Sequence, residues 1–119
     1  MDFYTYMLKD KQEFPNLINW FDKIKDNPKY VIVSTNDYYF ILNPSKNKIC
    51  RVESINPRIH LSDILLEIDK FLPHKQIVYV PLSKPNVITR FTEAGFRLEL
   101  RVKDKYVKGK DVYLLVKEV

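Results

Sequence analysis

The chain has 119 residues, a mass of 14.3 kDa and a formal net charge of +5 at pH 7. With 45% hydrophobic and 29% charged residues, the composition is that of an ordinary folded protein and excludes a disordered chain. No apolar run approaches the roughly 18 residues of a membrane-spanning helix, and the first residues do not resemble a secretory leader. The single Cys50 excludes an internal disulfide, and two histidines cannot complete a closed zinc site. We therefore expect one cytoplasmic domain, residues 1–119, without a metal.

The N-terminal part predicts a strand followed by a helix. Aromatic and apolar residues from 3 to 8 favour a short opening strand. Apolar residues then recur at helical spacing over residues 14–24, which predicts an amphipathic helix. Trp20 sits beside this stripe, and we expect it at the edge of the core. The helix ends at Asp26-Asn27-Pro28, because a residue before proline avoids the helical conformation.

Three strands are predicted next, over residues 30–35, 38–43 and 48–55. Short clusters of turn-forming residues separate them, so neighbouring strands must pair antiparallel. In the third strand, strict alternation predicts that Ile49, Arg51 and Glu53 share one face. Cys50 and Val52 are then expected on the other face.

A second amphipathic helix is predicted over residues 60–72. Its inward positions are all apolar: Leu61, Ile64, Leu65, Ile68, Phe71 and Leu72. A nearly continuous apolar strand follows at residues 76–82, as expected for a strand that is buried on both faces. The order strand, helix, strand implies a parallel pair with a right-handed crossover.

The last third predicts a helix, a sharp corner and a hairpin. Residues 85–94 carry an apolar helical face, and Gly95 supplies a backbone conformation in which a helix can stop. From Phe96 the period changes to two, which predicts that Leu98 and Leu100 point the same way as Phe96. A turn region at 104–110 then leads into a closing strand at the end of the chain.

This element order resembles the GNAT superfamily of acyl-CoA-dependent N-acyltransferases. The residues that carry the resemblance are Val80-Pro81, Phe91-Thr92-Glu93-Ala94-Gly95-Phe96 and the hairpin from Tyr106 to Lys117. The resemblance implies an α+β fold of three layers, with a mixed, mostly antiparallel sheet, one parallel crossover and the order β-α-β-β-β-α-β-α-β-β. It also implies a splayed gap between residues 52–57 and 78–82, which holds the cofactor in most members. Here we expect side chains such as Ile59 to fill that gap.

The residues that the family uses for its cofactor depart from the pattern in this chain. Members that use acyl-CoA carry a glycine-rich loop whose backbone N–H groups face the pyrophosphate. The corresponding residues, 55–63, include no glycine, and Pro57 has no N–H to donate. A tyrosine that protonates the leaving thiolate in many members corresponds to Phe91, which cannot transfer a proton. We therefore expect no cofactor and assign no catalytic residue.

An acetyl-CoA-dependent N-acetyltransferase with an atypical cofactor loop is the first alternative. Glu53 would then serve as general base, and His60 would bind an anion or act as a base. Acetyl-CoA would be held by four polar residues: Asn56, Arg58, Ser62 and Asn86. The competing interpretations are a Glu53 carboxylate paired with a lysine, and a His60 at the edge of the core.

A set of basic and aromatic residues on the terminal hairpin is the predicted partner-binding surface: Arg97, Arg101, Lys103, Lys105, Tyr106 and Lys108. Nucleic acid is a conceivable partner, because cations contact phosphates and aromatic rings stack on bases. Glu99, Asp104 and Asp111 dilute the positive charge, and no known nucleic-acid-binding module is present.

Three classes of function therefore remain open. The first is a catalytically degenerate GNAT-like domain that acts as a protein-interaction or assembly module, encoded by a virus or mobile element and located in the host cytoplasm or the virion. The second is the acetyltransferase, and the third is a basic nucleic-acid-associated protein. Terminal strands such as 111–119 can pair across a two-fold axis, so a homodimer is a further prediction.

Overall fold

The computed structural model describes residues 17–119. The strand predicted at residues 3–8 and the first residues of the helix predicted from residue 14 lie outside this range. Within it, the predicted element order and the α+β class are confirmed. No helix of these residues is long and apolar enough to span a bilayer.

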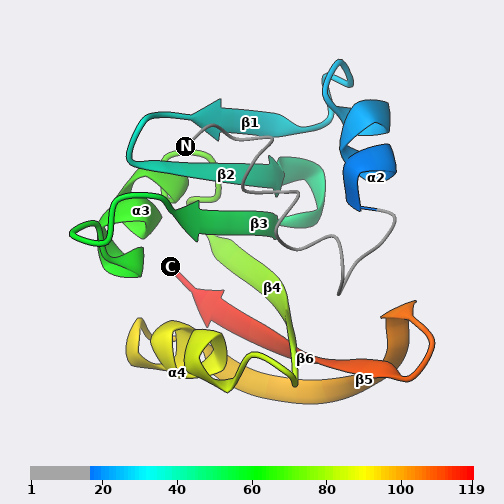
Figure 1. The fold of residues 1–119 in the computed structure, drawn as a ribbon. Coiled ribbons are helices and arrows are strands. Elements are labelled where there is room, and N and C mark those ends of the chain that lie inside the picture. Colours follow the sequence, from blue (N-terminus) through cyan, green and yellow to red (C-terminus); the bar gives the residue numbers. More distant parts are fainter. Residues whose placement is uncertain (1–16) are drawn as a thin grey trace.

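Six strands form one mixed sheet in the order β1-β2-β3-β4-β6-β5 (Figure 1). They are β1 (Val31–Ser34), β2 (Tyr38–Asn43), β3 (Lys48–Ser54), β4 (Lys75–Pro81), β5 (Arg97–Val107) and β6 (Lys110–Glu118). The helices that pack on this sheet are α2 (Leu17–Ile24), α3 (Leu61–Ile68) and α4 (Pro85–Glu93). A short 3-10 helix, η1 (Pro44–Lys46), joins β2 to β3.

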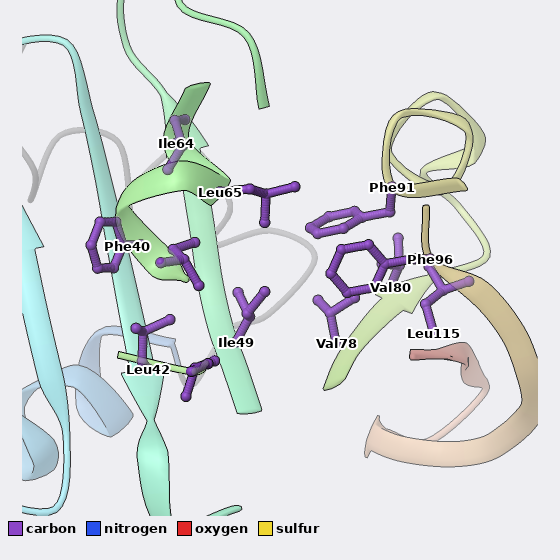
Figure 2. Close-up of a cluster of buried hydrophobic side chains, with 12 residues drawn as sticks. Phe40, Leu42, Ile49, Ile64, Leu65, Val78, Val80, Phe91, Phe96 and Leu115 are labelled. Carbon is purple, nitrogen blue, oxygen red and sulfur yellow. The ribbon is translucent and has the colours of Figure 1, made fainter. Parts of the chain in front are cut away.

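The two faces of the sheet carry separate hydrophobic clusters. α3 and α4 cover one face, where the larger cluster includes Phe40, Ile64 and Leu115, all at most 1% exposed (Figure 2). α2 covers the other face, where Phe21 packs against Tyr39 of β2. Neighbouring residues of β2 thus enter different clusters, which explains why this strand is apolar throughout. Helices lie on both sides of the sheet, so the predicted three layers are present.

β3 and β4 form the predicted parallel pair, with α3 as the crossover between them. Their pairing covers only Lys48 with Ile77 and Ile49 with Val78. Beyond these residues the two strands diverge (Figure 1). On its other side, β4 pairs with β6 over its whole length, from Lys75 to Pro81. The sheet therefore consists of two halves that separate at the position where the splayed gap is predicted.

A β-bulge in β3 changes the predicted alternation of that strand. Ile41 pairs with Arg51 but Leu42 pairs with Ile49, so Cys50 is an extra residue opposite β2. The bulge turns Ile49 into the larger cluster and leaves Arg51 on the opposite face. The prediction that these two residues share a face is therefore wrong.

A second bulge interrupts β5. Leu98 pairs with Leu115, but Leu100 pairs with Leu114, so Glu99 is the extra residue. Leu98 and Leu100 consequently face opposite sides of the sheet, and they are 55% and 49% exposed. The prediction of a single apolar face on this strand is wrong.

Three smaller differences concern the ends and the burial of elements. α3 ends at Ile68, and Phe71, which was expected to face inward, is 40% exposed. β4 buries alternate residues on one face and leaves those on the other face half-buried, whereas burial on both faces was predicted. β5 continues to Val107, into the predicted turn region.

The Gly-Phe corner after α4 is a Schellman motif, and it confirms the predicted helix stop. Gly95 has a φ of +99°, and its N–H donates to the Thr92 carbonyl at 3.1 Å. The Phe96 N–H donates to the Phe91 carbonyl at 3.0 Å, which completes the motif. The rings of Phe91 and Phe96 meet edge to face at 5.0 Å, the hydrophobic contact that accompanies such corners. The corner thus fixes Phe91 in the larger cluster.

Candidate functional site

A cavity of about 1020 Å³ lies where β3 and β4 diverge. It reaches both sides of the sheet, because His60 and Phe91 line it beside α3 and α4 whereas Trp20 of α2 and Tyr106 of β5 line it on the other side. Figure 2 shows Phe91 pointing from α4 toward Leu65 of α3 across the divergence. The cavity thus occupies the position that the resemblance assigns to a cofactor.

The expectation that side chains such as Ile59 fill the gap is wrong. Ile59 packs against the larger cluster and forms part of the cavity wall. Valine side chains of β3 and β4 make the wall apolar near the sheet: Val52, Val78 and Val80. Among the described residues, the charged side chains of the wall are four cations and two carboxylates: Lys48, Arg51, Lys84 and Arg90, with Glu53 and Glu93.

The loop from residue 55 to residue 60 connects β3 to α3. In its first half, the backbone N–H groups donate hydrogen bonds to acceptors within the protein. Ile55 and Asn56 both donate to the Asp37 carbonyl, at 2.7 and 2.9 Å. The Arg58 N–H donates to Oδ1 of Asn56 at 3.0 Å. These bonds hold the first half of the loop against the turn that contains Asp37. The N–H groups of this half are therefore already hydrogen-bonded.

The second half of the loop is engaged in the same way. The N–H of Ile59 donates to the Asn56 carbonyl at 3.0 Å, and the N–H of His60 donates to Oδ2 of Asp63 at 3.0 Å. Pro57 has no N–H. Every backbone N–H group from residue 55 to residue 60 therefore has a partner within the protein. Residues 55–60 thus offer no free N–H donor to a pyrophosphate, and the donors without a recorded partner in the corresponding segment are those of Leu61 and Ser62 in the first turn of α3.

Asp63 also places a negative charge at the first turn of α3, where a phosphate would otherwise be favoured. Asp63→Ala is expected to lower the free energy of unfolding by about 1 kcal/mol, because it removes the acceptor of the His60 N–H. Urea denaturation measures this loss. Ser62→Ala, at an exposed neighbouring position, is the control and should cost less than about 0.5 kcal/mol. Equal losses in the two variants would contradict the capping role of Asp63.

Phe91 occupies the position at which the resemblance expects a proton-donating tyrosine. Its side chain is 2% exposed, belongs to the larger cluster and borders the cavity. A phenyl ring there can pack against a ligand but cannot donate or accept a proton.

The two candidate catalytic residues, Glu53 and His60, both line the cavity but lie on opposite sides of the sheet. Glu53 is opposite Tyr39 on the face that α2 covers, whereas His60 precedes α3 on the other face. The Glu53 side chain is 35% exposed and forms an ion pair with Arg51 at 3.6 Å. His60 is exposed, so it is not a residue of the core edge.

The structure brings one of the four candidate cofactor-binding residues, Ser62, to the cavity. Asn56 is held in the loop, where its Nδ2 donates to Oδ1 of Asp37 at 3.1 Å. Arg58 and Asn86 are exposed, and neither of them lines the cavity.

The predicted basic surface does not form one face of the hairpin. The partners of Arg97 and Arg101 on β6 are three residues apart, so these arginines lie on opposite faces of the sheet. Arg97 is paired with Glu99 at 2.6 Å and with Glu118 at 3.5 Å. Arg101 is paired with Asp111 at 2.8 Å, and its hydrogen bond lowers the pKa of the Asp111 carboxyl. Two lysines of the predicted basic surface, Lys103 and Lys108, are exposed.

Lys105 and Tyr106 instead join two residues that sequence reasoning missed, Lys48 and Tyr79. The Nζ of Lys105 lies 4.3 Å from the centroid of the Tyr79 ring, and the Nζ of Lys48 lies 5.2 Å from it. The two tyrosine rings meet edge to face at 6.4 Å. We call these four residues the tyrosine–lysine cluster. No sequence signal could have found it, because the cluster forms only when β3, β4 and β5 come together.

Comparisons with known proteins give similarity at the level of structure alone. No family model matches the chain, and no curated protein matches it. The spermidine N-acetyltransferase SpeG of Vibrio cholerae in complex with CoA and spermine has a TM-score of 0.60 and 13% identity, over 87% of this chain and 74% of that chain. SpeG is also known as a dodecamer.

Two further solved structures are similar over most of their length. A GNAT family acetyltransferase from Elizabethkingia anophelis with acetyl-CoA bound has a TM-score of 0.61 and 14% identity, over 87% of this chain and 82% of that chain. A GNAT family protein from Desulfovibrio desulfuricans has a TM-score of 0.60 and 16% identity, over 85% of this chain and 76% of that chain. At these identities the similarity concerns the fold, and the chain has the fold of the GNAT superfamily.

Proposed function

We propose that this chain is a GNAT-fold binding domain without acyl-CoA-dependent transferase activity, and that its ligand occupies the cavity between β3 and β4. The observation that carries the proposal is the hydrogen bonding of residues 55–60, in which every N–H group has a partner in the protein. To hold a pyrophosphate, the loop would have to break these bonds, each worth about 0.5–1.5 kcal/mol.

Two further observations support the same proposal. Asp63 and Asp37, whose side chains accept hydrogen bonds at this loop, would repel a pyrophosphate. Phe91 stands where an acid would be needed for the leaving thiolate. These three features together disfavour acyl-CoA at this site.

A role in protein interaction or assembly remains part of the proposal. β5 is the last strand of the sheet, so its outer edge has no strand beside it among the described residues. Leu98 and Leu100 on this strand are exposed, which favours pairing with another chain. The dodecameric state of the Vibrio cholerae neighbour supports a homo-oligomer. An origin in a virus or mobile element stays a prediction.

A thermal-shift titration with acetyl-CoA tests the loss of acyl-CoA binding. At about 1 mM acetyl-CoA, a site with a Kd of about 10 μM would add about 2.7 kcal/mol of stability and raise the Tm by roughly 10 °C. We expect a shift of less than about 1 °C. Adenosine bisphosphate and pantetheine, tested separately, are the controls for contacts made by only one end of the cofactor. A saturable rise with acetyl-CoA that neither fragment reproduces would contradict the proposal.

An acetyltransferase with an atypical loop is the second candidate, and the open cavity is the observation that favours it. Glu53 lines this cavity on the side opposite α3, and its carboxylate is only partly exposed. If acetyl-CoA binds in the titration above, Glu53→Gln should abolish any acetyl transfer to an amine while leaving the binding intact.

A further inference from the structure

The tyrosine–lysine cluster (Lys48, Tyr79, Lys105 and Tyr106) is a charged site that the proposed function leaves unexplained. We propose that this cluster binds an oxyanion, the carboxylate or phosphate group of a small organic ligand that enters the cavity from the side of α2. This inference rests on the proposed function in one respect, namely that a ligand occupies the cavity.

The first argument is that two ammonium groups converge on the same pair of rings. The Nζ of Lys48 lies 5.2 Å from the centroid of Tyr79 and 5.7 Å from that of Tyr106. The Nζ of Lys105 lies 4.3 and 5.8 Å from the same centroids. Lys48 and both tyrosines line the cavity, and the exposed Lys105 lies over the same rings, so both cations lie at the edge of the cavity.

The second argument is that no carboxylate is recorded beside this pair of like charges within the described part of the chain. Within residues 17–119, neither ammonium group forms an ion pair with a carboxylate, and the recorded partners of both are the tyrosine rings. Ring faces attract cations but do not cancel the repulsion between two of them. An anion between the ammonium groups would replace this repulsion with two charge-assisted hydrogen bonds.

The third argument is the charge of the cavity wall. On the side of α2, the described charged residues of the wall are Lys48, Arg51 and Glu53, and Arg51 is paired with Glu53 at 3.6 Å, which leaves a net positive charge at Lys48. Such a wall disfavours a cationic ligand and favours an anionic one.

The titration of Lys48 agrees with this arrangement. Partial burial, and then the positive charges of Lys105 and Lys46, lower the pKa of Lys48, although Cys50 opposes this effect. A bound anion would raise that pKa again. Affinity for the anion should therefore be full below the pKa of Lys48 in the free protein and should fall as pH rises through it. The groups that face Lys48 are Lys46 and Cys50 along the chain, Tyr79 from β4, and Lys105 and Tyr106 from β5.

The test compares four probes that share one ring: benzoate, phenyl phosphate, benzyl alcohol and benzylamine. Binding to the full chain is measured by NMR titration at pH 7, with the ε-carbon shifts of the lysines as the second readout. We expect benzoate or phenyl phosphate to bind at least about tenfold more tightly than benzyl alcohol, since a charge-assisted bond is gained. The ratio of the benzoate and phenyl phosphate affinities shows which of the two oxyanions the cluster prefers.

Single variants locate the site. Lys48→Met and Lys105→Met should each weaken anion binding by about tenfold, whereas Lys103→Met, at an exposed position on the same strand, should leave it unchanged. Lys48→Arg keeps the charge and should retain most of the affinity.

Equal binding of the charged and neutral probes would overturn the inference, and so would anion binding that survives in Lys48→Met and Lys105→Met. These probes lack both pantetheine and pyrophosphate. Their failure would therefore leave the conclusion about acyl-CoA untouched, and acetyl-CoA binding in the thermal-shift titration would leave this conclusion about anions untouched.

Discussion

Phe40→Ala is expected to lower the free energy of unfolding by about 3–5 kcal/mol. Phe40 is fully buried in the larger cluster, and its ring packs against the rings of Tyr38 and Phe71, both with centroids 6.1 Å away. Truncation removes these contacts and leaves a cavity beneath α3 that the neighbouring side chains cannot close. The free energy of unfolding of a small domain is about 5–15 kcal/mol in all. The variant should therefore unfold at a clearly lower urea concentration and a clearly lower temperature than the unchanged protein.

Phe71→Ala is the matched control for this prediction. Phe71 contacts the same ring, but 40% of its surface is exposed. Its truncation should therefore cost clearly less than that of Phe40, about 1–2 kcal/mol by its smaller buried area. Similar losses in the two variants would show that Phe40 does not anchor the larger cluster.

Phe91→Ala is expected to cost about 3–5 kcal/mol for a different reason. Phe91 joins α4 to the corner at Gly95 through its edge-to-face contact with Phe96, and it separates the larger cluster from the cavity. Its removal would open the core to the cavity and loosen the end of α4. Equilibrium unfolding in urea measures the loss, and a cost below about 1 kcal/mol would contradict this role.

Phe91→Tyr is the companion variant, and it tests function as well as stability. The ring is kept, but a hydroxyl is added to a side chain that is only 2% exposed, so the free energy of unfolding should fall by about 1–3 kcal/mol, less than in Phe91→Ala. We expect no acetyltransferase activity to appear, because the loop at residues 55–60 still lacks free N–H donors for a pyrophosphate. Acetyltransferase activity in this variant would show that the protein lacks activity because of the missing tyrosine hydroxyl group and not because of the loop.

The sequence was sufficient to predict the elements whose signals are local. Helical spacing identifies α2, α3 and α4. The turn residues predict the antiparallel pairing of β1 with β2 and of β2 with β3. Gly95 is the clearest case, because the positive φ that it adopts is the property for which glycine is used at the end of a helix. The missing N–H at Pro57 is likewise visible without a structure.

The features that could not be predicted depend on partners far away in the chain. The bulges at Cys50 and Glu99 exist because of the register with β2 and β6, and alternation within one strand does not report that register. The cavity depends on the short pairing of β3 with β4, which apolar composition does not reveal. Lys48 and Lys105 are 57 positions apart in the sequence, so no local pattern connects them.

The two-residue junction between β3 and β4 also bears on how the molecule unfolds. Each half of the sheet has its own antiparallel ladder, and backbone pairing at Lys48 and Ile49 contributes little to holding one half against the other. Cohesion between the halves therefore comes from side chains such as Ile49, Val78 and Leu115. A molecule seated in the cavity touches both halves at once. Such a ligand would bind both halves of the sheet, so that they unfold together. Its binding would therefore increase the cooperativity of unfolding as well as the free energy of unfolding.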